Sequence, residues 1–215
     1  MVLMLTAVTG VTFAQDGYPD DNYPIFNDKL LIEGYAGKLA ATSKDAILAM
    51  INDDTLVAYR KAAAVRVFRT RFAPQIVTRE RAIVERAFLR QLELATSIYV
   101  QIELMNCLVT LDRYRYFEPM VPSLIQKIDH YDATASDMAY KSLLDINDSG
   151  TQRAREARIE FNTLRKIFFL MRKKLEAADP ADIRIKNKID LLKWSVKVLG
   201  TDELKNLPKE VINLM

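Results

Sequence analysis

Apolar side chains recur every three to four residues along most of this chain, most densely between Ser97 and Tyr116. On a helical wheel, the apolar positions of this segment fill one broad arc and leave only a narrow polar strip, which includes Glu103, for water. The arc comprises Val100, Leu104, Cys107, Leu108 and Leu111, extended by Ile98, Met105 and Val109. A helix that is apolar around most of its circumference must be covered from several sides. The pattern therefore predicts an all-α protein in which neighbouring helices pack along this segment.

The same spacing predicts further helices on both sides of the segment, joined by short turns. Thr42 and Asp45 form a capping box before a short helix, Pro74 ends the next helix, and Gly200 ends the last long one. The expected helices and a C-terminal cap cover 46–51, Thr55–Phe72, Thr78–Ala95, Pro119–Ile128, Ala133–Ile146, Gln152–Glu176, 179–199 and Thr201–Met215. Residues 43–215 are thus expected to form one helical domain.

The first 14 residues, MVLMLTAVTGVTFA, hold no charged side chain and end in a pattern of small residues. Such a segment is typical of a secretory signal peptide with cleavage after Ala14, although the usual basic residues are missing. The alternative is an N-terminal strand or helix packed into the core. We therefore expect a periplasmic or secreted protein, and a cytoplasmic one if residues 1–14 are not a signal.

Residues 15–42 are acidic and contain two prolines and three glycines, with several aromatic residues between them. This composition predicts a flexible leader, in which Asn27–Ala41 forms at most a short helix because its two glycines weaken it. The aromatic side chains either dock on a partner or pack back onto the first helices of the chain.

Half of the 215 residues are hydrophobic and 27% are charged, a balance typical of a globular protein with one sizeable core. The net charge of +3 is too small to indicate nucleic-acid binding on its own. The single histidine, His130, lies at a predicted helix end, and the single cysteine, Cys107, is expected to be a buried thiol. The chain has no glycine-rich phosphate loop, no Cys-x-x-Cys pair and no His-Glu-x-x-His motif. We therefore expect a protein that catalyses no reaction and uses no cofactor or small-molecule substrate.

Several helical segments share a pattern of closely spaced small residues. Asp54–Ala64 combines an acidic turn with such a core, Tyr99–Leu108 and Ala135–Leu144 follow it more loosely, and Pro119–Ile128 has the character of a preceding helix. Over about Ser43–Asp148 this pattern resembles HEAT-like and armadillo-type repeats, and its spacing is near the period of such arrays. The resemblance implies a short right-handed solenoid of helical hairpins, with C-terminal capping helices, that binds a protein on its inner helices. A simple helical bundle is the alternative architecture.

Two groups of side chains are candidates for contact with such a partner. The polar side of Thr55–Phe72 carries Tyr59, Arg66 and Arg69. The long helix Gln152–Glu176 carries a basic ridge, with an arginine at every seventh residue and one aromatic residue among the charges: Arg155, Arg158, Arg165, Lys166, Phe169 and Arg172. Arginine pairs with carboxylates through two hydrogen bonds, so the expected partner is a protein with an acidic surface.

The expected function is that of an exported, non-enzymatic adaptor that holds a protein partner on a helical-repeat surface. The alternative is a basic helical protein that binds an anionic lipid surface or nucleic acid through the ridge from Arg158 to Lys173. A third interpretation is that the ridge is only a solvated face, as most charge runs are. Salt would separate the first two, because binding to a polyanion falls steeply with ionic strength.

The segment Asp145–Glu156 matches the spacing of an EF-hand calcium loop, with oxygen-bearing side chains at the first, third and fifth places, Gly at the sixth and Glu at the twelfth. Against this interpretation, Gln152 stands where such loops carry an aliphatic residue, and two arginines within the segment would repel a divalent cation. The competing interpretation is a polar turn in which Ser149 or Thr151 caps the next helix. We therefore expect no metal site in the form of this loop.

Overall fold

The computed structural model describes residues 28–112, 117–149, 152–175 and 182–215. Within these ranges every regular element is a helix and no strand occurs, which confirms the prediction of an all-α protein. Residues 1–14, the predicted signal, and residues 15–27, the first part of the predicted leader, lie outside the described residues.

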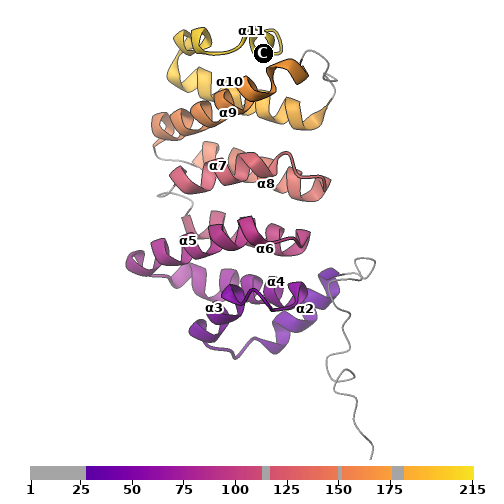
Figure 1. Cartoon of the computed structure of the whole chain (residues 1–215). Helices are drawn as coiled ribbons and strands as arrows, with labels where there is room; N and C mark the ends of the chain where they lie inside the picture. The colour runs from indigo at the N-terminus through magenta and orange to yellow at the C-terminus, as the bar shows by residue number, and fades with distance from the viewer. Residues whose placement is uncertain (1–27, 113–116, 150–151, 176–181) are drawn as a thin grey trace, which may run out of the picture.

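The helices follow one another through short connections and are labelled in chain order (Figure 1). The α-helices are α2 (Asp28–Lys38), α3 (Lys44–Asn52), α4 (Ala58–Val67), α5 (Thr78–Leu94), α6 (Ile98–Asp112), α7 (Phe117–Lys127), α8 (Ala133–Ser149), α9 (Arg153–Leu175), α10 (Ile183–Leu199) and α11 (Lys209–Ile212). A π-helical turn and a 3₁₀ turn extend α4, and another 3₁₀ helix follows α10: η1 (Phe68–Phe72), η2 (Ala73–Gln75) and η3 (Thr201–Asn206).

Helices two apart in sequence contact each other, so the chain is arranged in two rows. One row contains α3, α5, α7 and α9, and the other contains α4, α6, α8 and α10. Consecutive members of the two rows also pack as pairs: α3 with α4, α5 with α6, α7 with α8, and α9 with α10. Figure 1 shows the result as stacked layers that run from α2 to α4 at one end to α9, α10 and α11 at the other.

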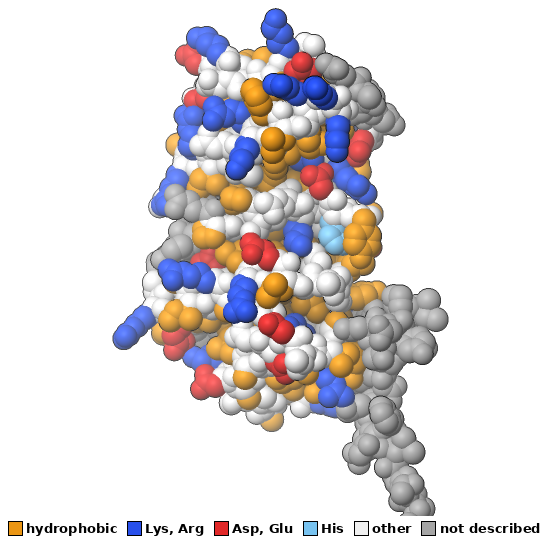
Figure 2. Space-filling view, in the orientation of Figure 1, with side chains coloured by type: hydrophobic (Ala, Val, Ile, Leu, Met, Phe, Trp, Pro, Cys, Tyr) orange, Lys and Arg blue, Asp and Glu red, His pale blue; other side chains and the backbone are white. Residues whose placement is uncertain are grey.

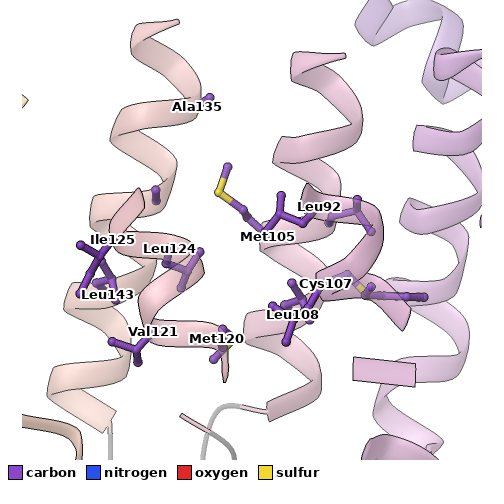
Figure 3. Packing of buried hydrophobic residues seen from close by; sticks show 14 of the residues in the cluster. Leu92, Met105, Cys107, Leu108, Met120, Val121, Leu124, Ile125, Ala135 and Leu143 are labelled. Atoms are coloured by element: carbon purple, nitrogen blue, oxygen red, sulfur yellow. The ribbon is translucent and has the colours of Figure 1, made fainter. Parts of the chain in front are cut away.

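Helix α6 is enclosed on several sides, as its apolar arc predicts. It contacts α4, α5, α7 and α8. Ile98 and Val109, which extend the arc, are partly buried, and the other arc residues are buried with exposed fractions between 0% and 3%: Val100, Leu104, Met105, Cys107, Leu108 and Leu111. Figure 3 shows part of this core, where labelled side chains of α6 lie beside Leu92 of α5 and near those of α7 and α8. Burial also raises the pKa of the Cys107 thiol, which is free and enclosed in this core.

The helix boundaries differ from the predictions where local hydrogen bonds decide them. The capping box assigned to Thr42 is wrong: Ser43 is the N-cap of α3, and its hydroxyl accepts a hydrogen bond from the Ala46 N–H at 3.3 Å. Likewise, the helix predicted to run to Phe72 is α-helical only to Val67 and continues as the π-helical η1. Helical spacing in the sequence does not distinguish these neighbouring helix types.

Part of the predicted leader belongs to the folded structure. Residues 28–38 form α2, which packs on α4 with Ile32 only 1% exposed. Tyr35 of α2 also meets Tyr59 of α4 edge to face, with ring centroids 5.8 Å apart. The folded chain therefore begins before residue 43, and tertiary packing overrides the weak helix propensity that Gly34 and Gly37 impose.

Substitution of Phe68 would measure how much the packing of this core contributes to the free energy of unfolding. The ring is 0% exposed and lies 5.1 Å from the Phe88 ring, centroid to centroid. We predict that Phe68→Ala lowers the free energy of unfolding by about 3–5 kcal/mol, because it removes a buried ring and leaves a cavity. Ile83→Ala, at a position 68% exposed on α5, should change it by no more than about 0.5 kcal/mol. Urea denaturation measures both values, and equal losses in the two variants would contradict the packing.

Candidate functional site

Tyr59 does not lie on a water-facing side of its helix, so that part of the prediction was wrong. Its exposed fraction is 6%, and its hydroxyl accepts a hydrogen bond from Nε of Arg60 at 2.9 Å. The prediction failed because α2 covers this side of α4, and no periodicity within α4 reveals such a contact. Tyr59 is therefore a core residue rather than part of an open surface.

Arg66 and Arg69 form ion pairs within the chain. Nε of Arg66 donates to Oε1 of Glu103 at 2.9 Å, and Nη2 of Arg69 lies 3.7 Å from the other oxygen of the same carboxylate. Arg66 also lies 3.6 Å from Glu33 of α2. Glu103 stands in the polar strip of α6 that the pattern assigns to water, yet its side chain is only 6% exposed because these arginines cover it. The cluster ties α2, α4, η1 and α6 together, which leaves α9 as the candidate binding surface.

Helix α9 separates its apolar and basic residues onto two faces. Its buried face packs against α7 and α10 through Ala157, Phe161, Leu164, Phe168 and Leu175. The residues predicted to form the basic ridge are all exposed on the other side: Arg155, Arg158, Arg165, Lys166, Phe169 and Arg172. In Figure 2, Lys and Arg side chains gather over the part of the molecule formed by α9 to α11, with hydrophobic side chains among them.

The first half of the ridge is held by contacts within the chain. Nη1 of Arg158 donates to Oε1 of Glu203 at 2.7 Å, and Asn206 donates to the other oxygen of that carboxylate at 3.0 Å. The hydrogen bond from Arg158, followed by that from Asn206, lowers the pKa of Glu203. Arg155 lies 3.4 Å from the side-chain oxygen of Gln152. These contacts fasten η3 to α9 and occupy the ridge at this end.

The second half of the ridge surrounds an open hollow of about 450 Å³. Phe169 and Leu170 are 55% and 80% exposed, and these two large apolar side chains are adjacent and line the same hollow. The Arg172 guanidinium lies 5.2 Å from the centre of the Phe169 ring, a cation–π distance. We call this surface the α9 patch and define it as Asn162, Arg165, Lys166, Phe169, Leu170 and Arg172, with Asn206 of η3 at its rim.

Sequence reasoning missed two features of α9 although the signals were present. Leu170 follows Lys166 by four residues, so a helical wheel places it on the basic face, where an apolar residue is exposed. Glu160 follows Ala157 by three residues and precedes Leu164 by four, so the same wheel places its carboxylate on the buried face. The position of Asn206 beside the α9 patch could not be predicted from the sequence, because η3 reaches α9 only through the tertiary fold.

Two other hollows lie at the contacts between helices. One, of about 330 Å³, is lined in part by Lys61, whose Nζ donates to Gln91 at 2.9 Å and lies 3.9 Å from Asp54. Burial lowers the pKa of Lys61. The other, of about 320 Å³, lies between η1, α6 and α8, with Arg69 at its edge. The Lys61 contacts join α4 to α5, so this lysine has a structural role in the packed helices.

A buried polar cluster lies where α8, α9 and α10 meet. It contains Asn147, Glu156, Glu160 and Ser195, each between 0% and 1% exposed. Burial raises the pKa of Glu160 to about 8, and polar contacts with Asn147 and Ser195 only partly oppose this effect. Burial also raises the pKa of Glu156, which the Gln152 N–H and the nearby Arg153 oppose. The interior of the protein thus contains two carboxyl groups that favour their neutral forms.

The described part of the segment that matches an EF-hand does not have the conformation of one. Its first five residues, 145–149, belong to α8, whereas an EF-hand loop turns its ligands around the ion over these places. The helix extends this far because the polar residues at its end do not interrupt the apolar spacing of Leu143 and Ile146, both buried. In the part of the chain that the structure describes, no three His, Cys, Asp or Glu side chains are arranged to hold a metal ion.

In comparisons with known proteins, no protein-family model, no curated protein and no solved structure matches this chain. Among the helices that the structure describes, none is both long enough and apolar enough to cross a membrane.

The raised pKa of Glu160 makes the stability of the protein depend on pH. Between about 4.5, the ordinary value, and about 8, the folded chain holds a proton that the unfolded chain has released. The free energy of unfolding should therefore fall by up to about 1.4 kcal/mol per pH unit across this window, and level off above it. Glu160→Gln should remove this contribution. Urea titrations from pH 4 to pH 9 in buffer free of divalent cations measure it, and identical pH profiles for both proteins would contradict the assignment.

Proposed function

We propose that this chain is a non-enzymatic adaptor of the helical-repeat class that binds an acidic protein partner through the α9 patch. The observation that carries the proposal is the exposure of Phe169 and Leu170 beside the basic side chains Arg165, Lys166 and Arg172. Aromatic residues and arginine are enriched at protein interfaces and dominate their binding energy. Large apolar side chains that cluster on a surface mark contact sites more often than isolated ones do.

The two-row arrangement supports the repeat class. The segments that resemble the second helix of a HEAT-like repeat lie on α4, α6 and α8, which are neighbours in one row. Pro119–Ile128, the segment with the character of a first helix, overlaps α7 in the other row. In repeat proteins each unit contacts mainly the units beside it, and the elongated surface that results serves for binding. In this proposal α9 to α11 form the C-terminal end of the array.

The charge of the α9 patch indicates the chemistry of the partner. Arg165 and Lys166 form no ion pair among the described residues, whereas Arg158 is already paired with Glu203. An acidic segment that supplies carboxylates to these two side chains, and an apolar side chain to the hollow beside Phe169, would match both properties of the surface. Arg66 and Arg69, which pair with Glu103, have no such role in this proposal.

An anionic lipid surface is the second candidate, because Leu170 is 80% exposed next to Lys166 and Phe169. Basic residues around exposed apolar side chains are typical of peripheral membrane binding. The apolar face of α9 is, however, buried against α7 and α10, so only two large side chains remain to enter a membrane. This limited apolar area favours the protein partner.

Export is part of the proposal, with cleavage after Ala14 as the uncharged N-terminal segment indicates. Protein recovered from its native host should then begin at Gln15, which N-terminal sequencing determines. Recovery with residues 1–14 intact would contradict cleavage after Ala14 and leave the proposal for the α9 patch unchanged.

Site-specific photo-crosslinking tests the partner. A benzophenone amino acid replaces Phe169 in one version of the protein and Ile83, which is 68% exposed on α5, in the other. We predict that the position 169 probe crosslinks one protein in the native host and that the position 83 probe does not. Arg165→Glu with Lys166→Glu should reduce the crosslink at least tenfold, because two attractive charges become repulsive.

The matched control reverses two exposed arginines elsewhere, Arg86→Glu with Arg90→Glu on α5, and should leave the crosslink unchanged. Crosslinking of the same proteins from positions 169 and 83 would contradict a specific surface. Absence of a protein crosslink, together with patch-dependent binding to vesicles that contain phosphatidylserine, would favour the lipid alternative.

A further inference from the structure

The buried polar cluster of Asn147, Glu156, Glu160 and Ser195 has a composition that the adaptor proposal does not explain. Its two carboxyl groups lie one helical turn apart on α9 and are 0% exposed. Among the described residues neither of them forms an ion pair. A buried carboxylate without a compensating charge is strongly unfavourable. The cluster therefore requires bound protons or a bound cation.

The hydrogen bonds within the cluster are incomplete. Ser195 donates to the Leu191 carbonyl at 3.0 Å, and its hydroxyl lies 3.4 Å from Oε2 of Glu160. Oε1 of Glu160 and Oε2 of Glu156 have no hydrogen-bond partner. Buried polar atoms without partners are rare in native proteins, so two carboxylate oxygens of this kind in one place need an explanation.

Asn147 provides an independent observation, because it reaches the cluster from another helix. It is 1% exposed, and neither its amide oxygen nor its amide nitrogen forms a hydrogen bond of normal geometry. The side chain comes from α8 and lies close enough to Glu160 to oppose the rise in the pKa of that carboxyl. Apart from this polar contact with Glu160, no group satisfies the buried amide, so its oxygen is available as a ligand beside the carboxyl groups. Three helices thus place buried polar side chains around Glu160: Asn147 from α8, Glu156 from α9 and Ser195 from α10.

The ligand chemistry limits which cation fits. All of the donors are oxygen atoms, which suit hard cations rather than zinc or copper. Calcium accepts irregular arrangements of carboxylate, amide and hydroxyl oxygens, whereas magnesium demands near-octahedral geometry and usually retains several waters. A region whose side chains are 0–1% exposed leaves little room for such waters.

We propose that Asn147, Glu156, Glu160 and Ser195 form a buried calcium site that fixes α9 against α8 and α10. Asn147 and Glu156 are also the third and twelfth residues of the EF-hand-like segment, but here they act from two helices rather than from one loop. The proposed site therefore excludes Asp145, the first residue of that segment, which lines the hollow between η1, α6 and α8. The site is independent of the partner of the α9 patch.

Calorimetric titration of the full chain with calcium chloride, after treatment with a chelator, tests the site at one fixed pH. We expect one calcium ion per chain and a higher temperature of unfolding in its presence, with a smaller effect of magnesium chloride. Glu160→Gln and Glu156→Gln should each abolish the calcium-induced shift. Both substitutions keep the shape of the side chain while removing its charge, so they should preserve the fold, as circular dichroism would verify.

Asp145→Asn is the matched control, because it removes the first ligand of the EF-hand alternative and no ligand of the proposed site. It should bind calcium like the parent. Loss of binding in Asp145→Asn, with binding kept in Glu160→Gln, would overturn the proposal in favour of a loop site. No heat of binding and no thermal shift in the parent would also overturn it, and would leave protons as the means by which the carboxyl groups are neutralised.

Discussion

The enclosure of α6 is the constraint on which the rest of the structure depends. A helix that is apolar over most of its circumference is stable in water only when other helices cover it. The chain meets this requirement with α4 and α8 beside α6 in its own row and with α5 and α7 in the other row. Once these four helices are in place, the two-row arrangement follows, and α9 and α10 extend it by the same contacts.

The polar side of α6 adds specificity to this enclosure. Glu103 pairs with Arg66 and Arg69 and is almost fully covered by them. Buried charges are tolerated only when they are paired, so this cluster restricts how α4 and η1 can lie on α6. The first candidate surface thus serves the fold. Helix α9, at the far end of the stack, uses Arg158 to hold η3 but also carries Arg165 and Lys166, which form no ion pair among the described residues.

The exposed apolar and basic side chains of α9 are consistent with its place in the stack. Helix α9 is covered by α7, α10 and α11, so its remaining face is open to solvent. Phe169 and Leu170 contribute nothing to the core from that face, yet they are large and apolar. Binding to a partner would explain why they are present on this face. The buried carboxyl groups on the opposite face pose a similar question, because an apolar residue would fill that space at lower cost.

Local periodicity predicted the helices well and the tertiary contacts poorly. The arc of α6 and the apolar face of α9 could be read from spacing alone, because burial in both is set by neighbours in sequence order. The environments of Tyr59 and Glu103 could not be predicted in this way. Helix α2 covers Tyr59, and Glu103 is covered by Arg66 of α4 and Arg69 of η1. The basic residues of the α9 patch were predicted from the sequence. Leu170 was not predicted to be exposed there, and Asn206 reaches the patch only because η3 contacts α9. In each case the missing information was which other helix lies nearby.

Amide hydrogen exchange of the free protein tests the central claim most directly, because it measures how often each helix opens. If α6 is the enclosed element on which the others depend, its amides should exchange only through global unfolding. They should then be the slowest in the molecule, and those of α2 and α11 at the two ends should exchange much faster. Exchange from α6 as fast as from α2 would contradict the account, since it would mean that the remaining helices hold together without it.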